Sequence, residues 1–185
     1  MKLFRHSLIL TFLVFSSHTL ACDKEAFGFL LGNAVPRDVK SVDEILFKGG
    51  SGPGNVIKSF LSEVPSPFPE FDKYAFWSNQ DMKVVYAITA YRKQIVDKSL
   101  IYDEGYRKKL KEETKLELSR LRKIFEEKNS LEYKATSPSE LTWVATPPGF
   151  RSTIGAYLGE YIYIECANIS LEKKAETEAW KTILR

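Results

Sequence analysis

Histidine is nearly missing from this chain. The only two histidines, His6 and His18, both lie within the first 21 residues. If that segment is removed, the remaining protein has no histidine at all. This excludes Ser-His-Asp and Cys-His catalysis, histidine metal ligands and a histidine pH switch.

A long hydrophobic run is also missing. Lys2 and Arg5 give the chain a positive start, an apolar run follows over 8–15, and small residues lead up to Ala21. This three-part pattern is typical of a secretory signal peptide. A helix needs about 20 apolar residues to cross a bilayer, and this run is shorter. We therefore favour a removed signal over a membrane anchor. We therefore predict a signal peptide over 1–21 and a single α+β domain over 22–185, located in the periplasm or secreted.

The chain has no strong excess of charge of one sign. Its formal charge falls from +3 to +1 when Lys2 and Arg5 are removed with the signal. A near-neutral surface gives no indication of nucleic acid or an anionic membrane surface as the partner.

Cysteine is scarce, with Cys22 and Cys166 as the only two. In an oxidising compartment such a pair forms a disulfide, and we predict one between them. The alternative is a lipid anchor on Cys22. We favour it less, because Thr19 stands where a lipoprotein signal usually has leucine.

The glycine-rich stretch over 47–59 (FKGGSGPGNVIKS) lacks the residues of a phosphate-binding loop. Gly49 and Gly54 have the spacing of a Walker loop, but Asn55 and Val56 stand where Lys and Ser or Thr are required. We predict a surface connection that binds no nucleotide, and a role in gripping a ligand or partner stays open. The calcium-loop pattern is also missing, and we expect no cofactor and no metal site.

Strand signals occur on both sides of a central charged segment. Runs rich in aromatic and β-branched residues, separated by turn residues, predict hairpins. They cover 74–77 with 83–91, and 152–158 with 161–167, and a further strand is expected over 141–145. Residues 26–31 and 55–61 also have strand character, whereas 33–46 is open between a helical turn and a strand.

Two segments have helical spacing of apolar residues. The stronger covers 103–128, with Asp103 as the N-cap and an apolar stripe formed by Tyr106, Leu110, Thr114, Leu118, Leu121 and Phe125. The weaker covers 170–184, with Ser170 as its cap. Separate groups of strands and helices indicate an α+β fold, an antiparallel sheet built from hairpins, and we expect both helices on one of its faces.

The candidate chemistry is limited. Without histidine, the main hydrolytic option is a pair of carboxylates acting on sugars, but no acid spacing marks such a pair, so we assign no catalytic residue. Aromatic residues are more suggestive, because an exposed group of them can grip a sugar chain or a protein. We select six candidate binding residues: Phe71, Tyr74, Phe76, Trp77, Tyr161 and Tyr163.

We therefore expect an exported, non-enzymatic binding protein. Its expected partner is another envelope or secreted protein, as for an inhibitor or immunity-type protein. A glycan is the other partner considered, through the alternative function of a carboxylate-based glycan-cleaving enzyme of the cell envelope.

Overall fold

The computed structural model describes residues 22, 24–35, 41–47, 56–61, 63–79 and 83–183. The predicted signal peptide over 1–21 lies outside the described residues, and so do 48–55, which hold the four clustered glycines.

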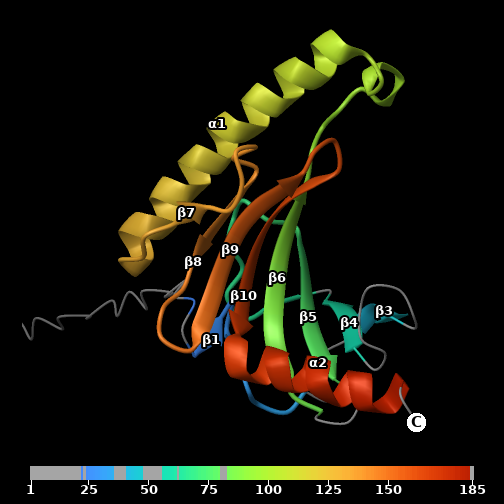
Figure 1. Ribbon diagram of the computed structural model, residues 1–185, viewed down its shortest axis with the longest axis vertical. Helices are drawn as coiled ribbons and strands as arrows, with labels where there is room; N and C mark the ends of the chain where they lie inside the picture. Colours follow the sequence, from blue (N-terminus) through green and yellow to red (C-terminus); the bar gives the residue numbers. More distant parts are fainter. Residues whose placement is uncertain are drawn as a thin grey trace, which may run out of the picture.

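The protein is built on one antiparallel sheet of eight strands, in the order β3-β4-β5-β6-β10-β9-β8-β7 (Figure 1). The first four strands are β3 (Ser41–Phe47), β4 (Val56–Leu61), β5 (Lys73–Asn79) and β6 (Val85–Lys93). The last four are β7 (Lys134–Ala135), β8 (Thr142–Ala145), β9 (Phe150–Tyr157) and β10 (Tyr161–Asn168). Pairing of β10 with β6 joins the two groups into one sheet. The α+β prediction is confirmed, and the open segment over 33–46 contains a strand.

Residues 26–31 form a tight hairpin instead of the single predicted strand. Its two strands, β1 (Glu25–Ala26) and β2 (Phe29–Leu30), flank Phe27 and Gly28, which both have positive φ. A Cβ on Gly28 would lie 2.5 Å from Cβ of Pro65, so the turn needs glycine both for its backbone angle and for space.

Helix α1 (Glu104–Asn129) runs along one side of the sheet, as Figure 1 shows. Asp103 caps it by accepting a hydrogen bond of 2.7 Å from the backbone N–H of Tyr106, as predicted. Its buried residues are Leu110, Thr114, Leu118, Leu121 and Phe125. They match the predicted stripe except for Tyr106, which is half-buried.

Helix α2 (Ile169–Ile183) packs on the other face of the sheet, so the expectation of both helices on one face is wrong. Side chains alternate along β10: Ile162 and Ile164 join the core cluster that holds the buried residues of α1, whereas Ala167 contacts Ala175 of α2. The cap also differs, because Leu171 donates its backbone N–H to Oδ1 of Asn168, at 3.1 Å. Neither helix in the described part of the chain combines the length and apolar composition that a bilayer span needs.

The predicted disulfide between Cys22 and Cys166 is present, with a Cα–Cα distance of 5.4 Å. Both cysteines are buried, and the bond holds the start of the described chain against the end of β10. It uses the Cys22 sulfur that a lipid anchor would need.

An ionic cluster holds α1 to the sheet. Arg92 of β6 donates to Glu117 of α1 at 2.6 Å, and Arg120 of α1 donates to both Glu117 and Glu70. Hydrogen bonds from Arg120 and then from Arg92 lower the pKa of Glu117 to about 2. The ionised Glu117 is therefore favoured by folding.

We expect the substitution Glu117→Gln to flatten the acid end of the stability profile. The pKa of Glu117 is lower in the folded chain, so its contribution is present above the unfolded pKa of about 4.3 and is lost as the pH falls through about 2. Because Glu117 is partly exposed, we expect the contribution to be about 1–2 kcal/mol, less than the full shift implies. Urea unfolding of the wild type and the variant between pH 6 and pH 2 measures this contribution. The exposed Glu127→Gln serves as control, and an acid loss in Glu117→Gln equal to that of the wild type would contradict the assignment.

Candidate binding site

The face of the sheet opposite α1 carries four tyrosines that contact one another. Tyr91 comes from β6, Tyr157 from β9, and Tyr161 and Tyr163 from β10. Tyr161 is central: its ring centroid lies 5.2 Å from that of Tyr91, 4.9 Å from that of Tyr157 and 6.3 Å from that of Tyr163. We call these four residues the tyrosine cluster. It lies beyond the part of the face that α2 covers.

Strand register brings the cluster together. Tyr163 of β10 pairs with Tyr91 on one side and with Gly155 of β9 on the other, while Tyr161 pairs with Tyr157. The Tyr163 ring lies over Gly155, where a Cβ would come within 2.6 Å of the ring. A glycine in the strand therefore makes room for the aromatic neighbour.

Lys58 of β4 extends its ammonium group among aromatic rings. Its Nζ lies 4.5 Å from the ring centroid of Tyr91, 4.8 Å from that of Trp77 and 5.1 Å from that of Phe60. Burial lowers the pKa of Lys58, and the negative charge of Glu165 partly opposes this effect. Within the described ranges, no carboxylate oxygen lies within 4.0 Å of this nitrogen. The three aromatic rings therefore surround the ammonium group within cation–π distance.

A polar chain crosses the same face between the cluster and α2. Trp77 Nε1 donates to Thr89 Oγ1 at 2.9 Å, and Thr89 Oγ1 donates to Glu165 Oε2 at 3.1 Å. Arg151 donates to Glu165 at 3.2 Å and to both oxygens of Glu172 on α2 at 2.7 Å. These bonds orient Trp77 and engage both oxygens of Glu165.

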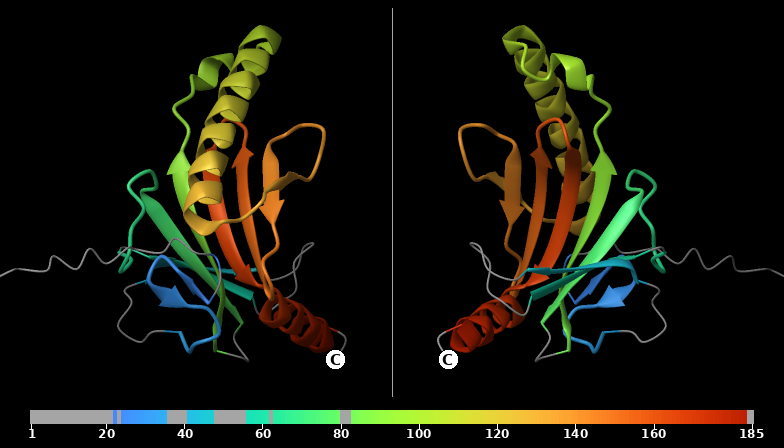
Figure 2. Two further views of the ribbon diagram at one scale, coloured as in Figure 1. Left: turned by 90° about the vertical axis from the view of Figure 1, so that its left-hand side faces the viewer. Right: turned by 90° about the vertical axis from the view of Figure 1, so that its right-hand side faces the viewer.

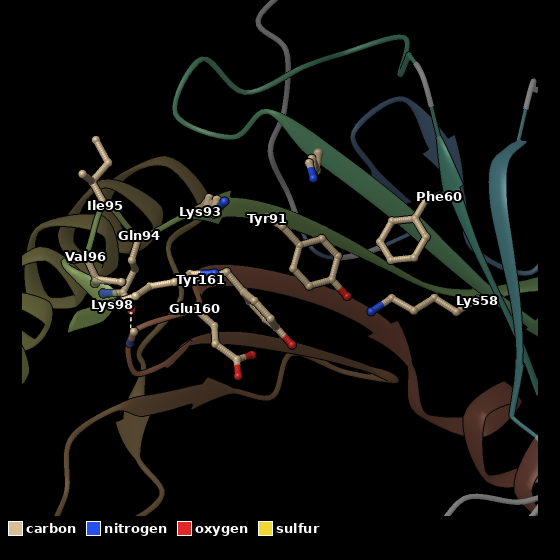
Figure 3. Close-up of a pocket in the computed structure, with 12 residues that line it drawn as sticks. Lys58, Phe60, Tyr91, Lys93, Gln94, Ile95, Val96, Lys98, Glu160 and Tyr161 are labelled. Atoms are coloured by element: carbon tan, nitrogen blue, oxygen red, sulfur yellow. Dashed lines mark hydrogen bonds between the residues drawn. The ribbon is translucent and has the colours of Figure 1, made fainter. Parts of the chain in front are cut away.

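A pocket of about 740 Å³ lies at the open end of this face (Figure 3). Lys58, Tyr91, Lys93 and Tyr161 line it from the sheet, and residues 94–96 with 159–160 line it from the neighbouring connections. Gln94 supports one side, because its side chain donates to Thr114 of α1 and accepts from the backbone N–H of Gly159, each at 2.8 Å. The volume is within the range of about 300–1,000 Å³ that small-molecule sites occupy.

The pocket lining carries an excess of positive charge. The described part of the lining contains the lysines Lys58, Lys73, Lys93 and Lys98, and one carboxylate, Glu160. Three aromatic residues, Phe60, Tyr91 and Tyr161, share the lining with them. The site therefore combines ammonium groups with ring surfaces.

An apolar tip adjoins the pocket. It is formed by Ile95, Leu100 and Tyr102 in the connection from β6 to α1, which includes the short helix η1 (Lys98–Leu100). Ile95 is fully exposed, Tyr102 is 92% exposed and Leu100 is 44% exposed. Figure 2 shows this connection at the far end of the molecule from α2. Large apolar side chains exposed along one short connection favour an interaction surface there.

The six predicted binding residues divide into two groups. Phe71, Tyr74 and Phe76 are 6%, 6% and 3% exposed and belong to the core, where the Tyr74 hydroxyl accepts from the backbone N–H of Phe68. They therefore offer no surface to a ligand. Trp77, Tyr161 and Tyr163 lie on the face that carries the site. Sequence reasoning did not select Lys58, Phe60, Tyr91 or Tyr157. Only the position of Tyr157, which a three-residue turn over 158–160 separates from Tyr161, signalled a neighbour.

Comparison with protein-family models, with curated proteins and with solved structures finds no match to this chain. Within the ranges that the structure describes, no group of three or more cysteine, histidine or acidic residues is arranged to hold a metal ion. A function has to be inferred from the residues of the site.

Proposed function

We propose that this chain is an exported, non-enzymatic protein that acts by binding another envelope or secreted protein, in the manner of an inhibitor or immunity-type protein. The observation that supports this proposal best is the tyrosine cluster next to the apolar tip. Ile95 of the tip and Tyr161 of the cluster line the same pocket, so the two features meet there.

The composition of this surface is that of a protein-binding hot spot. Tyrosine and tryptophan are enriched at such sites because they bury a large area at a small cost in side-chain entropy. Tyr157 is 54% exposed, and its ring is held by contacts with Tyr161 and Tyr163. A partner that covers it would meet a side chain that is already ordered.

Export is supported by the disulfide. Bonds of this kind persist in the periplasm and outside the cell and are rare in the reducing cytosol. The Cys22–Cys166 bond is consistent with the signal peptide that the sequence predicts, which itself stays a prediction.

Replacing Tyr102 or Tyr157 with serine tests the proposed surface without changing the pocket lining. Affinity capture from the native envelope fraction would first identify a partner, and calorimetry with that purified partner would then measure affinity. Loss of an aromatic anchor costs about 1–2 kcal/mol, so we expect binding weakened by about 5–30-fold in each variant. Leu116→Ser on α1 is the matched control, because Leu116 is 73% exposed and lies on the opposite side of the sheet. Unchanged affinity in both tyrosine variants would reject this surface.

The alternative function, a carboxylate-based glycan-cleaving enzyme, would need two acids facing each other across the site. The described pocket lining supplies one, Glu160, and the nearby Glu165 is bonded to Arg151 and Thr89. Purified protein that degrades cell-wall glycan, with activity lost in Glu160→Gln and no protein partner captured, would overturn the binding proposal.

A further inference from the structure

We propose that the pocket lined by Lys58, Tyr91 and Tyr161 binds a small organic anion: a molecule with one or two planar rings and a carboxylate, sulfonate or phosphate group. This site goes beyond the proposed protein partner and does not depend on it. The ligand's acid group would lie among the lysines and its rings against the aromatic side chains.

Charge at the pocket selects the sign of the ligand. Among the described residues, four lysines and one glutamate line the cavity. Deeper on the same face Arg151 is shared by Glu165 and Glu172, and including these three groups still leaves an excess of two positive charges. The predicted mature chain as a whole is close to neutral, so this excess is local and favours an anion in the pocket.

Lys58 makes the preference stronger. Its ammonium is half-buried among three rings, and burial lowers the pKa of Lys58. A charge in such surroundings interacts more strongly with an opposite charge than it does in water, because the local dielectric constant is lower. An anion beside Lys58 would therefore offset the cost of burying the ammonium group.

The aromatic lining selects the shape of the ligand. Tyr91 and Tyr161 meet edge to face, with ring centroids 5.2 Å apart, and Phe60 lines the cavity beside them. Figure 3 shows Lys58 directed toward Tyr91, so ring surface and positive charge lie next to each other. A planar ring that carries an acid group satisfies both features, whereas a small inorganic anion would leave the ring surfaces uncovered.

The pocket is held open by bonds that a ligand does not need to supply. Gln94 links the turn between β9 and β10 to α1 through its two hydrogen bonds, and this turn carries Gly159 and Glu160. Sites that are formed before the ligand arrives bind with a smaller loss of conformational entropy.

Two fluorescent probes that differ in one charged group test the proposal. Anilinonaphthalene sulfonate has aromatic rings and a sulfonate, and N-phenylnaphthylamine has the same rings without it. In fluorescence titrations of the purified, disulfide-bonded protein, we expect one sulfonate probe per chain, bound at least about tenfold tighter than the neutral probe. Its affinity should fall with added salt. Equal affinity for the two probes would overturn the proposal.

Variants then locate the probe. The double substitution Lys93→Gln/Lys98→Gln, and separately Lys58→Met, should each weaken the sulfonate probe by about tenfold without weakening the neutral probe. Lys93 and Lys98 are exposed, so the double variant should keep its fold, as a circular dichroism melt would show. The control is Lys123→Gln/Lys134→Gln, which removes the same charge from exposed positions outside the pocket. An equal loss in the control would show attraction by net charge alone and would reject the site. No partner protein is involved, so this result is separate from the test of the proposed function.

Discussion

Replacing both Cys22 and Cys166 with serine is expected to lower the free energy of unfolding by about 3–5 kcal/mol. The two residues are separated by 144 positions, so the bond restricts nearly the whole unfolded domain. In the chain-entropy model a loop of this length gives the upper part of that range. The bond also stabilises the folded state, because it holds the β1–β2 hairpin against the core cluster.

Urea unfolding of the wild type and the double variant, with and without a reductant, measures this effect. The reduced wild type should match the double variant, and the reductant should leave the variant unchanged. A loss below about 1 kcal/mol would mean that the described N-terminal segment is held by packing and that the bond adds little.

The second large effect is expected for Phe125→Ala. Phe125 is 1% exposed, and its ring centroid lies 5.3 Å from that of Phe68. The same side chain lines a small cavity beside both disulfide cysteines and Phe27. Removing the ring leaves a void where α1, the N-terminal hairpin and the sheet meet, which costs about 3–5 kcal/mol for a buried phenylalanine.

Leu116→Ala is the matched comparison on the same helix, since Leu116 is 73% exposed and lies off the buried stripe. Its expected change is within about 0.5 kcal/mol. Thermal and urea unfolding of the two variants should therefore differ clearly. Equal losses would mean that α1 contacts the sheet through another face than the one the structure shows.

The cysteine and Phe125 substitutions both change the side of the sheet that faces α1. They should therefore lower stability without changing the candidate binding site. The disulfide and Phe125 belong to the core cluster on that side, whereas the tyrosine cluster and the pocket lie on the other. A folded sample of either variant should still bind the sulfonate probe. Such a variant keeps the strand register that positions Tyr91 and Tyr161.

Local patterns were enough to predict much of the fold. The stripe from Leu110 to Phe125 was correct because the spacing of side chains along a helix decides which of them share a face. Asp103 was correct as a cap because its partner, the N–H of Tyr106, is three residues away. The hairpins β5–β6 and β9–β10 were correct for the same reason, since their paired strands follow each other closely in the chain. The disulfide followed from the count of two cysteines and the predicted export.

The candidate site depends on contacts between residues far apart in the chain, and no short sequence pattern predicts such contacts. Tyr91 lies beside Tyr163 because β6 pairs with β10, and Lys58 reaches Tyr91 across β5, so the cluster joins residues far apart in the chain. A shift of one residue in that pairing would turn the tyrosines to the opposite face. The same limit explains why Tyr74 and Phe76 could not be distinguished from Trp77. Alternation separates the two faces of β5, but only the packing of α1 and α2 decides what each face contacts. Composition and spacing therefore determined the elements, and the tertiary arrangement of the strands and helices determined which aromatic residues are left for a ligand.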